Sequence, residues 1–131
     1  VICQDRKLTK DVYHEMLGKA KVVFSANLQE TLGISCYEAV LANAVPMVPN
    51  RLSYDEMYTA TFKYPSEWTE SLEMSRKYRS FLKATIRFHM ECYDNDSNYS
   101  YHSAMNELKT KLTQEYFSCN NLLKVMFNDK Y

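Results

Sequence analysis

The chain has 131 residues, and its 16 Lys and Arg balance 16 Asp and Glu, so it lacks the net positive charge typical of an autonomous nucleic-acid-binding protein. A hydrophobic content of 46% excludes a disordered tail. Two glycines cannot form a glycine-rich phosphate loop, and no apolar run reaches the roughly 20 residues that span a bilayer. Four cysteines without a C-x-x-C pair favour buried free thiols in a reducing, cytoplasmic setting.

The first half of the chain alternates short apolar runs with helical patterns. In chain order, the pattern predicts a strand at 1–3, a helix at 9–17, a strand at 21–25, a helix at 33–43, a strand at 45–48, a short helix at 54–58 and a strand at 61–64. This alternation indicates α/β architecture, in which about four short parallel strands form half of a doubly wound, Rossmann-like sheet. Because the sequence begins within an apolar run, we expect an N-terminal part of a longer protein to precede it.

The second half shows helical periodicity only. A helix is expected from residue 66 or 69 to about 92, followed by a polar turn at 94–98. A second long helix carries an apolar seam from Tyr101 to Met126. We therefore divide the chain into a Rossmann-like core at 1–65 and a helical segment at 66–131 that packs on this core or on an absent N-terminal domain.

The segment from Glu30 to Glu56 carries the chemistry. A loop leaves the carboxyl end of a predicted strand near Ser25, at the sheet edge where open α/β proteins bind ligands. This loop contains Glu30 and passes through Gly33 into a helix, whose free N–H groups attract phosphate. Glu38 follows about 7.5 Å further along the helix axis. An acid, an amide-lined anion site and a second acid match the sugar, diphosphate and ribose of a nucleotide-sugar.

These residues resemble the retaining glycosyltransferases of the GT-B fold. Glu30 and Glu38 reproduce their E-(seven residues)-E motif, and the segments at 16–25 and 45–49 resemble the elements around that motif. Asn-Arg-Leu-Ser-Tyr-Asp-Glu at 50–56 is similar to a variant found in tRNA-queuosine-type and phage-encoded glycosyltransferases, with Asp55 where proline is more usual. The resemblance covers roughly residues 8–60 and implies that residues 1–65 form the donor-binding core of a C-terminal domain.

The resemblance also implies residue roles. Glu30 is the expected catalytic-site residue and would contact hydroxyls of the donor sugar, while Glu38 would bind the ribose. Backbone amides for the sugar and diphosphate would come from Thr31, Leu32, Gly33 and Ile34. The family's basic pair and acceptor site belong to upstream parts absent here, so we expect this chain to bind a donor such as a UDP- or GDP-hexose and to be inactive alone.

Several alternatives stay open at this stage. The acceptor is unknown, and a modified nucleic-acid base is one alternative. Arg51 is a candidate for a phosphate or acceptor contact, or for a surface salt bridge. A function of another class is a non-catalytic interaction module that uses the apolar seam at 101–126. We expect no cofactor besides the substrate and no membrane partner. His89 and Cys92 have metal-ligand spacing and His102 follows them, but a zinc site needs a fourth ligand for which there is no clear candidate, so no metal site is predicted.

Overall fold

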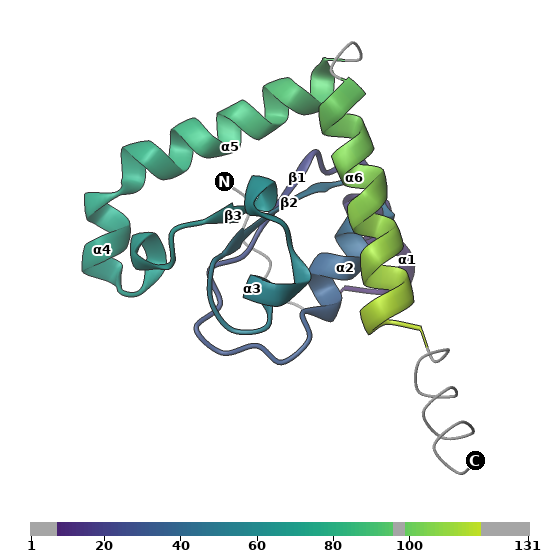
Figure 1. The fold of residues 1–131 in the computed structure, drawn as a ribbon, viewed down its shortest axis with the longest axis horizontal. Helices are drawn as coiled ribbons and strands as arrows, with labels where there is room; N and C mark the ends of the chain where they lie inside the picture. The colour runs from purple at the N-terminus through teal and green to yellow at the C-terminus, as the bar shows by residue number, and fades with distance from the viewer. Residues whose placement is uncertain (1–7, 96–98, 119–131) are drawn as a thin grey trace.

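The computed structural model describes residues 8–95 and 99–118. Within these ranges, a parallel sheet contains three strands in the order β1 (Val22–Phe24), β2 (Val45–Pro49) and β3 (Lys63–Tyr64) (Figure 1). The predicted α/β class is confirmed. The three predicted strands at 21–25, 45–48 and 61–64 are each present with shifted ends, and the expected strand at 1–3 lies outside the described residues.

Six α-helices surround this sheet in the described part of the chain. They are α1 (Lys10–Lys19), α2 (Ile34–Leu41), α3 (Tyr54–Met57), α4 (Leu72–Lys77), α5 (Arg79–Asp94) and α6 (Tyr99–Lys111). Two short 3-10 helices, η1 (Ala60–Phe62) and η2 (Ser66–Thr69), flank β3, and a π-helical turn, η3 (Leu112–Tyr116), continues α6. None of the described helices is both long and apolar enough to cross a bilayer.

The central strand β2 contains two prolines, although proline cannot donate to a ladder. Val45 N–H and Met47 C=O both bond to the β1 side, so Pro46 faces the β3 side, where pairing begins only at Val48. Pro49 lies where a parallel ladder would direct an N–H toward Ser25 C=O. Pro46 therefore removes no ladder bond from the β1–β2 pair, whereas Pro49 removes one at the end of the strand; all five residues of β2 are buried.

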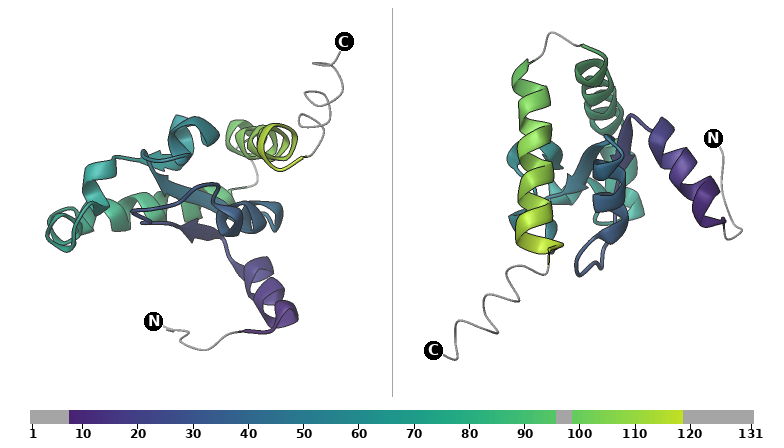
Figure 2. Two further views of the ribbon diagram at one scale, coloured as in Figure 1. Left: turned by 90° about the horizontal axis from the view of Figure 1, so that it is seen from below. Right: turned by 90° about the vertical axis from the view of Figure 1, so that its right-hand side faces the viewer.

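The main core joins β2 to α2, α3, η1 and α6. Its buried members are Cys36, Val40, Val45, Val48, Tyr54, Met57, Tyr58, Phe62, Tyr101, Met105, Leu108 and Leu112. Figure 1 shows α5 running across one end of the sheet and meeting α6 at a corner of the molecule. In Figure 2, α1 stands apart from the sheet, and none of its residues is buried.

The predicted helix from 66 or 69 to 92 is wrong as a single element. The structure breaks it into η2, α4 and α5, with Tyr78 between α4 and α5 at φ −100° and ψ 14°. The Ser71 side chain caps α4 by accepting from Met74 N–H. No proline or glycine marks the break at Tyr78, whose ring instead stacks on Trp68. Tertiary packing of aromatic rings therefore sets this bend.

Several apolar residues on the predicted helices are exposed. Ile34 and Leu41 on α2 are 56% and 50% exposed, and Phe81 on α5 is 56% exposed. The seam prediction is confirmed where it can be seen, because Tyr101, Met105, Leu108 and Leu112 are buried, whereas its members beyond residue 118 lie outside the described residues. α1 continues through Gly18 and ends at Lys19, two residues beyond the predicted end at 17.

Candidate functional site

The loop that follows β1 begins at Ser25, which is buried at the carboxyl edge of the sheet. Ser25 N–H donates to Met47 C=O at 3.0 Å. The Ser25 carbonyl receives no hydrogen bond from Pro49, which has no N–H, and accepts instead from the Tyr64 hydroxyl at 2.6 Å. The Tyr64 hydroxyl also lies 3.0 Å from Thr69 Oγ1. A hydrogen bond from the Tyr64 side chain thus takes the place of the ladder bond that Pro49 cannot form, and the residues after Ser25 leave the sheet as a loop.

The Tyr54 side chain contacts two residues of this loop. Its hydroxyl lies 3.2 Å from Ser25 Oγ and accepts from Asn27 Nδ2 at 3.5 Å. Burial raises the pKa of Tyr54 to about 12, so the phenol is neutral at pH 7 and acts in hydrogen bonds rather than as a charge. Tyr54 was part of the recognised Asn-Arg-Leu-Ser-Tyr segment, but its buried position under the loop was not predicted.

Gly33 connects the loop to α2 in the left-handed conformation, at φ 67° and ψ 48°. A Cβ at this position would lie 2.9 Å from Tyr54 Cε1, so both the backbone angle and the close ring require glycine. The first turn of α2 has N–H groups without intrahelical acceptors. Because Ile34 and Ser35 at this turn are exposed, an anion can approach these amides from solvent.

Glu30 lies in the same loop and is half-buried. Its carboxylate accepts from Asn27 Nδ2 at 3.0 Å and from Thr31 N–H at 3.2 Å. Thr31 is exposed and Leu32 is half-buried against the core. The structure therefore brings Glu30 to the loop that enters α2, where an ionised carboxylate can also accept hydrogen bonds from sugar hydroxyls.

Glu38 has a different environment on the side of α2 that faces α1. It lines a hollow of about 300 Å³ together with His14, Leu17, Leu41 and Ala42. Burial, and then the negative charge of Glu38, raise the pKa of Tyr13 on α1. A ribose bound by Glu38 would therefore lie beside α1, along α2 from the amides that would hold the diphosphate.

Arg51 fastens the loop to the neighbouring segments. Its Nε and Nη2 donate to the carbonyls of Asn27 and Ala26, each at 2.9 Å, and Nη1 donates to Ser66 C=O at 3.0 Å and to Ser66 Oγ at 3.4 Å. These contacts use most of the guanidinium donors, so a phosphate contact would depend on the remaining N–H. The sequence drew attention to Arg51, but the structure gives it bonds to backbone rather than a salt bridge within the described residues.

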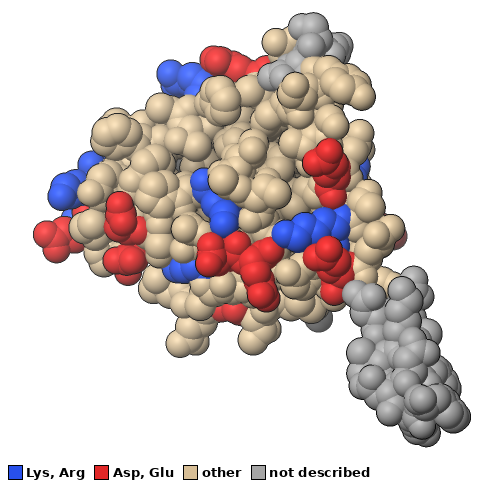
Figure 3. All heavy atoms as spheres, in the orientation of Figure 1, with Lys and Arg blue, Asp and Glu red and all other residues tan. Residues whose placement is uncertain are grey.

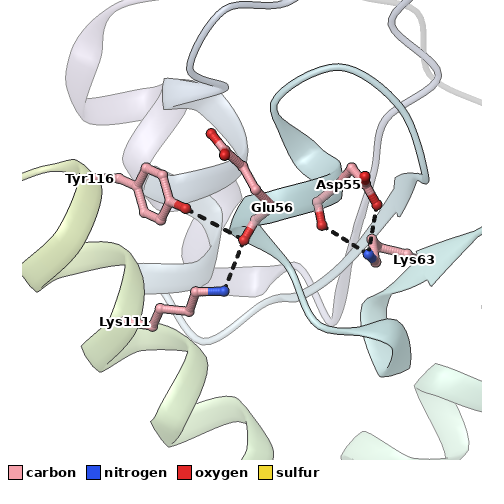
Figure 4. Close-up of polar contacts among 5 residues, drawn as sticks. All are labelled: Asp55, Glu56, Lys63, Lys111 and Tyr116. Carbon is pink, nitrogen blue, oxygen red and sulfur yellow. Dashed lines mark hydrogen bonds and ion pairs between the residues drawn. The ribbon is translucent and has the colours of Figure 1, made fainter.

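The end of α6 and the turn η3 contact both α3, which follows β2, and α2, which follows β1. Lys111 Nζ and Tyr116 Oη donate to Glu56 C=O at 2.9 and 3.4 Å, beside a Lys63–Asp55 ion pair of 3.1 Å (Figure 4). On the face drawn in Figure 3, positive and negative side chains lie next to one another in the middle of the molecule. At this end, Lys63 thus pairs with an acid, whereas Lys111 donates to a backbone carbonyl.

Tyr37 on α2 contacts η3 and the residue that follows it. Its hydroxyl lies 2.8 Å from Thr113 Oγ1, and its ring stacks on Phe117 with centroids 3.8 Å apart. These contacts keep α2, and therefore its first turn, in place.

No group of three or more His, Cys, Asp or Glu within residues 8–95 and 99–118 is arranged to hold a metal ion. No family model and no solved structure matches the chain. The assignment of the site therefore depends on the geometry above and on the motif resemblance.

Proposed function

We propose that this chain is the nucleotide-sugar-binding C-terminal domain of a retaining glycosyltransferase of the GT-B type, which transfers a hexose from a UDP- or GDP-hexose in the cytoplasm. In this proposal the parallel sheet is half of a doubly wound, Rossmann-like sheet. A partner N-terminal domain would supply the acceptor site and the upstream basic pair. The acceptor is a separate question, and a modified nucleic-acid base is one alternative for it.

The observation that carries the proposal is the arrangement around Gly33. A left-handed glycine in the loop after β1 leads into α2, whose first turn carries exposed Ile34 and Ser35. The carboxylate of Glu30 lies in the same loop, where it accepts from Thr31 N–H. A diphosphate fits free amides at a helix N-terminus, and a carboxylate fits the hydroxyls of a sugar. This order along the chain supports a nucleotide-sugar rather than a free phosphate.

The proposed reaction requires little covalent chemistry from these residues. The donor already carries a good leaving group, so the domain would hold the sugar and stabilise the departing diphosphate electrostatically. Glu30 would orient the sugar as an ionised acceptor, unlike the acid–base carboxylate pair of a glycosidase. Arg51 and Tyr54 would act as positioning residues, because Arg51 donates to the loop carbonyls of Ala26 and Asn27 and Tyr54 contacts the side chains of Ser25 and Asn27.

The interaction-module alternative has less support. The described part of the seam is covered inside this chain, since Met105 and Leu108 on α6 pack against the core with Tyr101 and Leu112. An apolar face that is already buried leaves little surface for a partner helix.

Isothermal titration calorimetry with UDP, GDP and their hexose derivatives tests the proposal. We expect binding of at least one of them, weakened about tenfold or more by Glu30→Gln, the loss typical when a charged hydrogen bond is removed. Glu107→Gln on the exposed side of α6 is the matched control and should bind like the parent chain. Absence of heat with every ligand in a folded sample, or equal effects of the two substitutions, would contradict donor binding through Glu30.

A further inference from the structure

The cations of the described residues fall into two groups. Apart from Lys10, those outside α4 and α5 contact an acidic side chain or a polar oxygen of the chain; they are Lys19, Lys21, Arg51, Lys63, Lys109 and Lys111. Five cations on α4 and α5 form no ion pair or hydrogen bond through their charged groups with any described residue; they are Arg76, Lys77, Arg79, Lys83 and Arg87. We call these five residues the basic face.

The basic face is concentrated within a chain that is neutral overall. Residues 74–90 contain all five cations and no acidic residue, and Glu73 and Glu91 flank this stretch. All five side chains are exposed. Lys77 Nζ lies 5.3 Å from the centre of the Tyr78 ring, a contact that keeps its charge near the bend between the helices. Unpaired positive charge is therefore gathered on one part of the surface.

The bend at Tyr78 makes these cations converge. Arg76 and Lys77 at the end of α4, and Arg79 and Lys83 at the start of α5, line a hollow of about 430 Å³ together with Ser80. Beyond the hollow, Arg79, Lys83 and Arg87 follow one another at intervals of four residues, which is about 6 Å per step along one side of α5. This line of charge is about 12 Å long from Arg79 to Arg87, and its last step, about 6 Å from Lys83 to Arg87, extends past the residues that line the hollow.

We propose that the basic face binds the phosphate backbone of a nucleic-acid strand. A single phosphate group would need only the hollow, whereas repeated phosphates also match the line that continues to Arg87. An anionic membrane is a weaker match, because the exposed rings of Phe81 and Phe88 lie about half a turn around α5 from Arg79. A flat bilayer surface cannot contact the cations and insert both rings at once.

This inference goes beyond donor binding. Strand binding itself is independent of the proposed glycosyl transfer, and only the further step, that the bound strand is the acceptor, rests on that function. The sequence signal for the basic face was the run of residues 74–90 without an acid, which the balanced overall charge concealed.

Fluorescence anisotropy with a labelled 12-residue oligouridylate tests the proposal, with the full chain titrated between 50 and 200 mM salt. We expect binding at low salt, and we expect the double substitution Arg79→Gln and Lys83→Gln to weaken it about tenfold and to reduce the salt slope by about 1.4, the value for two lost phosphate contacts. The pair Lys10→Gln and Lys19→Gln on α1 makes the same change in net charge and should alter the affinity less than about twofold.

Three results would overturn the proposal. They are no binding of the oligonucleotide at 50 mM salt by a folded sample, equal losses in the two double variants, and binding of phosphatidylserine vesicles without binding of the oligonucleotide. Donor calorimetry on the same samples separates the two proposals, because strand binding that persists without donor binding would refute only the proposed glycosyl transfer.

Discussion

At the scale of single residues, the two glycines of the chain have opposite roles. Gly33 combines φ 67° with a ring atom 2.9 Å from the place of a Cβ, whereas Gly18 lies within α1 with nothing within 4 Å of that place. We expect Gly33→Ala to lower the free energy of unfolding by about 1–2 kcal/mol from backbone strain alone. Gly18→Ala should raise it by about 0.5–1 kcal/mol, because alanine favours a helix.

Urea unfolding followed by far-ultraviolet circular dichroism measures both glycine substitutions under the same conditions. If Gly33→Ala does not lower the free energy of unfolding, the left-handed conformation of Gly33 and its contact with Tyr54 do not constrain the loop. In that event the path of the chain into α2, and with it the candidate site, would need revision.

Motif resemblance drew attention to Glu30, Gly33, Glu38 and Arg51, but it could not give their surroundings. The structure brings Glu30 together with Asn27, whereas it puts Glu38 beside α1. The partners of Arg51 could not be predicted because its contacts with Ala26 and Ser66 join segments that are far apart in the chain.

At the scale of elements, α5 and α6 are joined by a buried polar contact. His89 on α5 is 3% exposed, and its Nδ1 lies 2.9 Å from the Tyr101 hydroxyl. Burial lowers the pKa of His89 below 6.5. As the pH falls, His89 therefore binds a proton in the unfolded chain before it does so in the folded chain. The contribution of neutral His89 to the free energy of unfolding is fully present above about pH 6.5 and is lost below it, by at most about 1.4 kcal/mol per pH unit.

Chemical unfolding between pH 5 and 7 tests this linkage through the slope of the free energy of unfolding against pH, rather than through its absolute value. We expect the slope to become flatter in His89→Gln and to stay unchanged in His14→Gln, since His14 is exposed on α1. A slope that survives in His89→Gln would assign the acid sensitivity to other groups.

The elements differ in how far the sequence predicts them. Short apolar runs predict β1 and β2. The helix predicted from residue 9 begins there, because the Thr9 side chain caps α1 by accepting from Val12 N–H at 3.4 Å. The break between α4 and α5 was missed, because it depends on Tyr78 stacking against Trp68 rather than on a local breaker. Periodicity likewise identifies an apolar residue such as Ile34 without showing that the α2 turn on which it lies faces solvent.

At the scale of the whole molecule, tyrosine is an unusual component of the core. Tyr54, Tyr58, Tyr64 and Tyr101 are all at most 7% exposed. Burial raises the pKa of each, to about 12 for Tyr54. In the unfolded chain these phenols ionise near pH 10. The folded state is therefore fully stabilised below about pH 10 and loses stability as the pH rises through the higher folded pKa values.

Tyr58 allows a direct test of this alkaline linkage. Its buried hydroxyl has no hydrogen-bond partner within the part of the chain that the structure describes, so Tyr58→Phe removes an unsatisfied polar group. We expect the free energy of unfolding at pH 7 to stay unchanged or to rise by about 1 kcal/mol, and the gain over the parent chain to grow above pH 10.

Tyr54→Phe is the matched comparison for Tyr58→Phe. Its hydroxyl contacts Ser25 and Asn27, so its removal should cost about 1 kcal/mol at pH 7, while the loss of stability above pH 10 should again become smaller. Urea unfolding at pH 7 and pH 11 measures both variants. Equal destabilisation by the two substitutions at pH 7 would mean that the Tyr58 hydroxyl has a hydrogen-bond partner, and an undiminished loss of stability above pH 10 in Tyr58→Phe would contradict its role in the alkaline linkage.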